Sequence, residues 1–578
     1  MPFSSPPSYA QFARLFHSKG QGSPDAFPHD TIAAPTFVSA SPAIHCAIIR
    51  PDMLKFTTIR KIKMNCSPHG LRSAIALAVL ALSCTVASAT DYYIAQSVAG
   101  SGDASSCANA KASSWNWASP SVADGDTVHV CGAITSALII PKGGTTTAIT
   151  LQFMSGAQFS SPAWVAAIQA YGLSHLIIDG GANGLIQNTA NGDGLANQSA
   201  SYGVYLSLCT NVEVKNLTIS NLYVHVRGTP SSPMVYGVFD TGGTGISIHN
   251  NTIHDAYYGI FRAASYSGSN LNWFANTIYN CNWGFGVTAG GVGIVLDTVN
   301  VHNNDVTMGT IWDDTGNGNH HNGIYAYTDP TPNARITNLS FYNNYVHGAI
   351  GQQWTSTAMF FASYGVISPK IYNNSFVGNS GDPATGYIVL DSNALSSTPL
   401  VANNTIIGTS VVPYLNTWMG ANIYPRCLEV DNSPLSAVTF ENNICATVYN
   451  GMATDIVIAS DYNDIWNVTD YGVISGTYYT AWPGVGSWQA AGYDTHGTNG
   501  NPLLSSSYEL QPGSPAIGAG ANLYTVCNGQ PNPGLGALCS DLSGNPRPSS
   551  GAWDAGAFSF NSAPNPPNPP AGLTTLVH

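Results

Sequence analysis

The stretch VNVHNNDV at residues 299–306 contains the pattern that decides the fold. Apolar and polar residues alternate from Val299 to His302, two asparagines follow, and an apolar residue returns at Val306. Alternation with a period of two is typical of a β-strand with one face in a core and the other in solvent. Asparagine tolerates left-handed backbone geometry, so the pair predicts a turn between two short strands.

The same pattern recurs along the chain. It appears in VEVKNLTI (212–219), ISIHNNTI (246–253), LNWFANTI (271–278), LSFYNNYV (339–346), PKIYNNSF (369–376), PLVANNTI (399–406) and VTFENNIC (438–445). A strand–turn–strand unit of this size cannot bury its apolar face alone and must stack on its neighbours. We therefore predict an all-β, single-stranded right-handed parallel β-helix with Asn-bearing turns. Its asparagines should form a side-chain ladder, and its core should contain Ile248, Ile253, Val301, Val306, Phe341 and Val346.

Both ends of the repeat region carry a family resemblance. DYYIAQSVAGSGD (91–103) and ADGDTVHVCGAITSALIIPKGGTTTAITLQF (123–153) resemble the first coils of secreted β-helix proteins of the pectate-lyase-like superfamily. LQPGSPAIGAG (510–520) and DLSGNPRPSSGAWDAGAF (541–558) resemble their closing segments. The resemblance implies the β-helix and an extracellular setting. It does not specify a reaction, because the superfamily includes polysaccharide lyases, hydrolases, epimerases and non-catalytic surface proteins.

A targeting segment organises the N-terminal part. Arg72, the apolar run at 73–87 and the small residues up to Ala89 follow the pattern of a signal peptide, and the run is shorter than a membrane span. This predicts a secreted or cell-surface protein with no transmembrane segment after cleavage. The expected organisation is a non-native or disordered extension (1–63), a signal peptide (64–89), a cap with the first coils (90–160), the central β-helix (161–470), C-terminal coils and cap (471–560) and a Pro-rich tail (561–578).

The net charge limits the classes of binding partner, and the cysteine content bears on disulfide bonding. After residue 89 the chain holds 9 basic and 27 acidic residues, a net charge of 9 − 27 = −18, which argues against nucleic acid. We expect a monomer whose partner is a polysaccharide or a cell-surface glycan. The eight cysteines of this region permit disulfides in an exported protein, and the favoured pairs are close in sequence: Cys107 with Cys131, Cys427 with Cys445, and Cys527 with Cys539.

The candidate catalytic residues lie in IWDDTGNGNHHNGIYAY (311–327) and just after it. Carboxylates and imidazoles in one loop could supply an acid and a base, and loops on rigid scaffolds often carry function. The candidates are Asp313, Asp314, His320, His321 and Arg335. The alternative is a hydrophilic loop whose Asp residues cap turns and whose His residues bond to backbone.

Polygalacturonases of this architecture use Asp-Asp, Gly-His-Gly and Arg-Ile-Lys motifs. Here the histidines lack flanking glycines and Thr337 replaces the lysine, so the resemblance does not assign that activity. A lyase would use His321 or Arg335 as the base and would need positive charge or calcium to stabilise the enolate. Calcium is therefore left open, no other cofactor is implied, and metal ligands are unknown.

Candidate substrate-binding residues come from the outward columns of the stacked strands and from the middle tryptophans. Lys215, His249 and His302 occupy one aligned position that alternation places outward. Together with the scarce basic and aromatic groups, the candidates are Lys215, His249, Arg262, His302, Trp312 and Trp354. The sequence thus leaves two classes open. One is a secreted protein that binds or cleaves a polysaccharide as a lyase or a glycoside hydrolase, and the other is a non-catalytic surface or adhesion protein.

Overall fold

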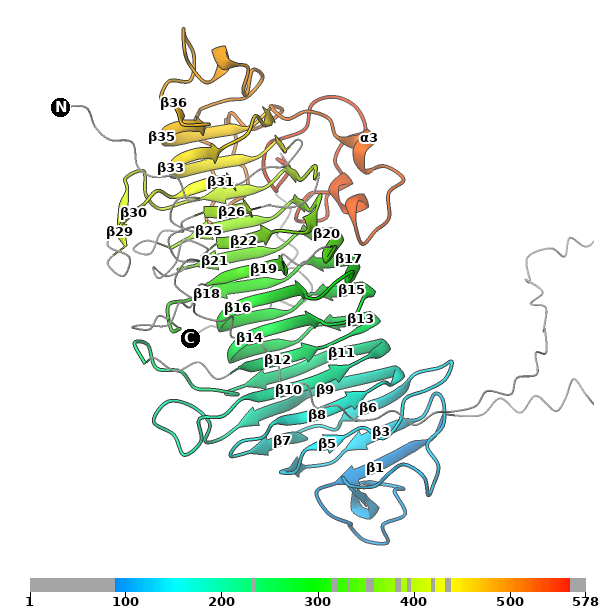
Figure 1. The fold of residues 1–578 in the computed structure, drawn as a ribbon. Coiled ribbons are helices and arrows are strands. Elements are labelled where there is room, and N and C mark those ends of the chain that lie inside the picture. Colours follow the sequence, from blue (N-terminus) through cyan, green and yellow to red (C-terminus); the bar gives the residue numbers. More distant parts are fainter. Residues whose placement is uncertain are drawn as a thin grey trace, which may run out of the picture. The chain divides into compact units, whose positions relative to one another are not determined.

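The computed structural model describes residues 89–561 except 230–233, 313–320, 330–332, 350–357, 380–385, 392–396, 417–420 and 432–437. The predicted extension, the signal peptide up to residue 88 and the tail from residue 562 lie outside the described residues. The described part is a right-handed parallel β-helix whose successive coils stack along one axis (Figure 1). The fold class predicted from the asparagine repeat is confirmed.

Each coil passes through three parallel stacks of strands, here named A, B and C. Stack A contains β5 (Leu138–Ile139), β8 (Ala166–Tyr171), β10 (Ser201–Ser207), β12 (Val235–Asp240), the ends of β14 (Thr252–Ala264) and β16 (Thr277–Ala289), β19 (Asn322–Thr328), β22 (Ala358–Ser363), β26 (Gly386–Asp391), β31 (Arg426–Asp431), and the ends of β33 (Ile444–Thr454) and β35 (Asp464–Ile474).

Stack B follows stack A in every coil. It contains β1 (Asp91–Ala95), β3 (Thr127–Val130), β6 (Ile149–Phe153), the starts of β9 (Ser174–Asn188) and β11 (Cys209–Ser220), β13 (Gly243–His249), β15 (Gly268–Phe274), β17 (Val295–His302), β20 (Arg335–Tyr342), β23 (Val366–Ile367), β24 (Lys370–Tyr372), β27 (Leu400–Ala402), β32 (Thr439–Glu441) and β34 (Ala459–Asp461).

Stack C closes the coil after the asparagine turn. It contains β4 (Ala133–Ile134), β7 (Gln158–Ser161), the ends of β9 and β11, the starts of β14 and β16, β18 (Asp305–Met308), β21 (Tyr345–Gly348), β25 (Ser375–Gly378), β28 (Thr405–Ile407) and the starts of β33 and β35. The remaining elements are β2 (Lys111–Ala112), β29 (Tyr414–Asn416), β30 (Ala421–Ile423), β36 (Thr477–Tyr479), η1 (Cys107–Asn109), η2 (Gln489–Ala491), α3 (Tyr524–Cys527) and η3 (Leu535–Cys539).

The asparagine ladder forms as predicted at the turn between stacks B and C. The amide nitrogen of Asn344 donates to Asn374 Oδ1 at 3.0 Å and to the Val301 carbonyl at 2.9 Å, and Asn344 Oδ1 accepts from Asn304. The same bonds connect Asn251, Asn276, Asn304, Asn344, Asn374, Asn404, Asn443 and Asn463. All six predicted core side chains are at most 1% exposed.

The two asparagines of each pair have different tasks. The first adopts left-handed backbone geometry, with φ of 53° at Asn343 and at Asn373, while the second supplies the ladder amide. Asparagine is suited to both tasks because it tolerates this conformation and carries both a donor and an acceptor. The dipeptide therefore encodes a turn and an inter-coil bond together.

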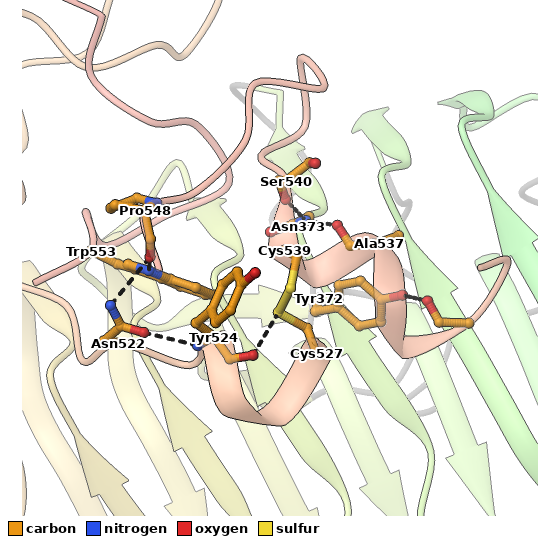
Figure 2. The surroundings of a disulfide bond; sticks show 11 residues. Tyr372, Asn373, Asn522, Tyr524, Cys527, Ala537, Cys539, Ser540, Pro548 and Trp553 are labelled. Carbon is orange, nitrogen blue, oxygen red and sulfur yellow. Dashed lines mark hydrogen bonds between the residues drawn. A yellow bond between two sulfur atoms is a disulfide. The ribbon is translucent and has the colours of Figure 1, made fainter. Parts of the chain in front are cut away.

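The C-terminal segment packs against the outer face of stack B. Figure 2 shows Tyr372 and Asn373 facing the loop that contains the Cys527–Cys539 disulfide. The Tyr372 hydroxyl donates to the Gly534 carbonyl, and Asn373 Nδ2 donates to the Ser540 carbonyl at 2.7 Å. All three predicted disulfides are present, the other two being Cys107–Cys131 and Cys427–Cys445. None of the helices in the described ranges is long and apolar enough to cross a membrane.

Replacing Asn344 by Leu is expected to lower the free energy of unfolding by about 1–3 kcal/mol, because Asn304 and Asn374 would lose buried partners. Urea denaturation measures the loss. The matched control is Asn343→Gly, which keeps the left-handed turn and should cost less than about 1 kcal/mol. Equal costs at both positions would contradict the separate tasks of the two asparagines.

Asp494 ends the ladder and makes it sensitive to pH. Its Oδ1 accepts from Asn463 Nδ2 at 2.7 Å, and complete burial raises its pKa to about 6. Because the folded state binds this proton more tightly than the unfolded chain, this group lowers stability as pH rises from about 4 to about 6. Urea denaturation across this range should show that the stability difference between the wild type and Asp494→Asn changes with pH. A difference independent of pH would show that Asp494 titrates normally.

Candidate functional site

Only some of the predicted catalytic residues lie in the described part of the chain. Asp313, Asp314 and His320 lie outside the described residues. His321 is fully buried and immediately precedes the stack A strand β19, and Arg335 is exposed at the start of β20 in stack B. The catalytic role of these five residues therefore remains a prediction.

His321 lies near a buried pair that sequence reasoning did not find. His225 Nδ1 is 2.7 Å from Asp193 Oδ2, and both side chains are at most 5% exposed. Burial lowers the pKa of His225, Asp193 partly offsets this, and His321 adds to the lowering. The His225 ring stacks on Trp312 at 4.2 Å, so this predicted sugar-binding tryptophan is buried between loops.

The predicted column of stack B faces outward, as alternation requires. Lys215 pairs with His249, and the column continues through Phe274 to His302. Glu213 Oε1 accepts from Lys215 Nζ at 2.9 Å and lies 2.8 Å from His249 Nε2. The rings of His249, Phe274 and His302 stack nearly parallel along the axis, so they present their edges rather than their faces to solvent. The column supports the fold, and its role in substrate binding remains a prediction.

Arg262 is placed inside the β-helix. It aligns with the core residues Leu206 and Val287 through the stack A register and is fully buried in an ion pair with Asp240. Since a side chain in this position does not reach solvent, the structure places Arg262 away from any surface that a glycan could contact. Trp354, the last predicted binding residue, lies outside the described residues.

A group of neighbouring carboxylate side chains lies on the outer face of stack A. Asp391 and Asp431 are register partners on neighbouring strands, and Asp455 follows on the next coil. Glu429 is two residues before Asp431 and is only 1% exposed, and its Oε1 accepts from the Arg426 guanidinium. Adjacent strands are about 4.8 Å apart, so three carboxylates form a column beside a buried fourth.

Glu429 and Asp431 form a carboxyl pair. Burial raises the pKa of Asp431 well above its usual range, and the negative charges of Glu429, Asp391 and Asp455 raise it further, while Arg426 partly offsets this. Burial also raises the pKa of Glu429, and neighbouring Asp431 and Arg426 partly offset this. Glu429 Oε2 and Asp431 Oδ2 are both buried and have no hydrogen-bond partner. Two neighbouring carboxyl groups with raised pKa values favour a state in which one of them keeps its proton.

Aromatic side chains occupy the same outward columns on earlier coils. Phe239, Phe261, Tyr325 and Phe361 precede Glu429 in one column, and Tyr236, Tyr258 and Trp283 precede Arg426 in the other. Tyr325 packs at 4.3 Å on Trp283 and at 4.9 Å on Phe361. The outer face of stack A thus changes from aromatic to acidic along the axis.

The acidic column was missed because the asparagine alignment covers stacks B and C only. A usable signal existed in GYIVLD (386–391), RCLEVD (426–431) and GMATD (451–455), three apolar strands that each end in Asp. Among the described residues, no group of three or more His, Cys, Asp or Glu side chains is arranged to hold a metal ion.

Comparison with known proteins gives matches only among solved structures. No protein-family model and no curated protein matches the sequence. The chain is similar to pectate lyase Pel9A, with 15% identity over 82% of this chain and 97% of that chain and a TM-score of 0.32. It is also similar to a double mutant of the tailspike protein of E. coli bacteriophage HK620 in complex with a pentasaccharide, with 11% identity over 71% of this chain and 77% of that chain and a TM-score of 0.35.

By its strand pairing, the chain is a parallel β-helix. The low identities and TM-scores of the two matches say nothing about its reaction.

Replacing Arg262 by Met should lower stability by about 3–5 kcal/mol, since Asp240 would remain as an unpaired buried charge. The double variant Arg262→Met/Asp240→Leu should recover most of this loss. Chemical denaturation of the wild type, Arg262→Met, Asp240→Leu and the double variant measures the coupling. A double variant as unstable as the single one would show that the pair does not act as a unit.

Proposed function

We propose that this protein is a polysaccharide-cleaving enzyme of the glycoside hydrolase type, with Asp431 as its general acid. The observation that carries the proposal is the pair of neighbouring carboxyl groups of Glu429 and Asp431, each with a buried oxygen that has no hydrogen-bond partner and each with a pKa that burial raises. Glycoside hydrolysis needs one carboxyl group that stays protonated and a second that is ionised. Glu429 is buried while Asp431 is partly exposed, so Asp431 is the member that can reach a substrate.

In this mechanism Asp431 donates its proton to the glycosidic oxygen as the bond to the anomeric carbon breaks. A water molecule supplies the new C–O bond, and an ionised carboxylate accepts its proton. Asp391 and Asp455 lie on the two coils flanking Asp431 and are the candidates for this base. Glu429 is a positioning residue that keeps Asp431 protonated, and Arg426 holds Glu429 in place.

A hydrolase fits this face better than a lyase. A lyase stabilises an enolate with positive charge. Among the described outward residues of stack A, the basic side chain is Arg426, and its charge is already paired with Glu429. We place the protein outside the cell, and the three disulfides support this because such bonds persist in oxidising compartments.

Asp431→Asn should lower kcat/KM on a cleaved polysaccharide by at least about a hundredfold, the usual scale for a general acid, with little change in melting temperature. Reducing-end release from a polysaccharide panel measures the activity. Asp461→Asn is the matched control, because Asp461 pairs with His496 on the outer side of stack B. Full activity of Asp431→Asn would remove this residue from the mechanism, and a wild type that releases no product would refute the enzyme.

Glu429→Gln tests separately whether Glu429 raises the pKa of Asp431. The alkaline limb of the pH profile reports deprotonation of Asp431, whose pKa burial and the charge of Glu429 raise. Removing that charge makes ionisation of Asp431 easier, so the limb should move to lower pH. The measurement is kcat/KM as a function of pH for both proteins. An unmoved limb would show that Glu429 does not control the acid.

A further inference from the structure

We infer that the outer face of stack A binds an uncharged polysaccharide, laid along the β-helix axis from the aromatic coils to the acidic column. This inference rests on the proposed function for the position of the cleavage site. The fold by itself does not decide whether the polymer is charged. Three features of the face support the inference: its charge, an unpartnered buried amide oxygen and its register.

The charge of the face disfavours a polyanion. Asp391, Asp431, Asp455 and Asp470 lie on four consecutive coils, and Arg426 is neutralised by Glu429. The other Lys and Arg residues among the described residues lie elsewhere. Arg262 and Arg547 are buried, Lys215 is paired with Glu213, Lys370 and Arg335 belong to stack B, and Lys111, Lys142 and Arg227 lie outside the stack A strands. A uronate polymer would bring like charges against the acidic column, which disfavours its binding.

The face also carries a neutral polar atom that lacks a partner. Asn450 is the register partner of Arg426 on the next coil, is 3% exposed, and its Oδ1 has no hydrogen-bond partner. A buried acceptor without a donor is costly, and a sugar hydroxyl is a donor that would satisfy it without adding negative charge.

The register places the aromatic coils within reach of the acid. Tyr325, Phe361 and Val389 lead to Glu429 in one column, so Tyr325 is three coils, or roughly 15 Å, from the carboxyl pair. Tyr325 is partly exposed, as are Tyr202 and Tyr205 farther along the same face. Phenol rings combine an apolar surface with a hydroxyl, which suits the apolar faces and hydroxyl groups of neutral sugars.

Affinity electrophoresis tests the charge preference without turnover. The full-length Asp431→Asn protein is run through gels containing a neutral polymer (β-glucan, xylan, galactomannan or dextran) or a polyanion (polygalacturonate or alginate), at low and high salt. We expect at least one neutral polymer to bind with the same affinity at both salt concentrations. At low salt, every polyanion should bind at least tenfold more weakly than this neutral polymer. Tight polyanion binding that weakens with salt, or no binding of any polymer, would overturn the inference.

Two variants that each remove one aromatic ring locate the bound polymer on the protein surface. Tyr325→Ala should weaken binding of the neutral polymer at least fivefold. Phe274→Ala, an outward ring of stack B, should leave it unchanged. The reverse result would place the polymer on stack B and overturn the inference.

Cleavage by the wild type separates the two proposals. Hydrolysis of a polyanion would leave the proposed function standing and refute the neutral ligand. Binding of a neutral polymer without hydrolysis of any polymer would refute the proposed function and leave the inference of a neutral ligand standing.

Discussion

The structure depends on one repeated interaction, the hydrogen bond between asparagine amides on successive coils. Each ladder amide is buried, so a coil that slipped by one residue would leave donors and acceptors without partners. The ladder therefore fixes the register of stacks B and C over nine side chains, from Asn251 to Asp494. Parallel pairing then carries this register around each coil into stack A.

A fixed register turns single residues into columns. Every side chain on an outward position lies about one strand spacing from its equivalents on the neighbouring coils, so a carboxylate repeated on three coils must face like charges. Such a column is unfavourable when ionised, and burial together with the neighbouring carboxylates raises the pKa of Asp431. The chemistry of the site thus follows from the geometry that the asparagines impose.

The fold was predictable because its determinants are local and periodic. The double asparagine marks the turn, alternation marks the core, and the three disulfides join cysteines that are close in sequence. The site was not predictable in this way, because Asp391, Asp431 and Asp455 are separated by 40 and 24 residues and no shared turn aligns them. Arg262 shows the same limit: it was predicted to bind substrate, yet the stack A register directs it inward beside Asp240.

The difference between the stacks also bears on how such a protein can change function while keeping its fold. The outer face of stack B near its C-terminal end is covered by the segment containing Cys527 and Cys539, which bonds to the left-handed asparagines such as Asn373. Substitutions there would disturb both the turn and the segment that covers it. The outward residues of stack A take no part in the ladder, so they can vary without loss of register. Stack A is therefore the face on which a ligand site can be built at the least cost to stability.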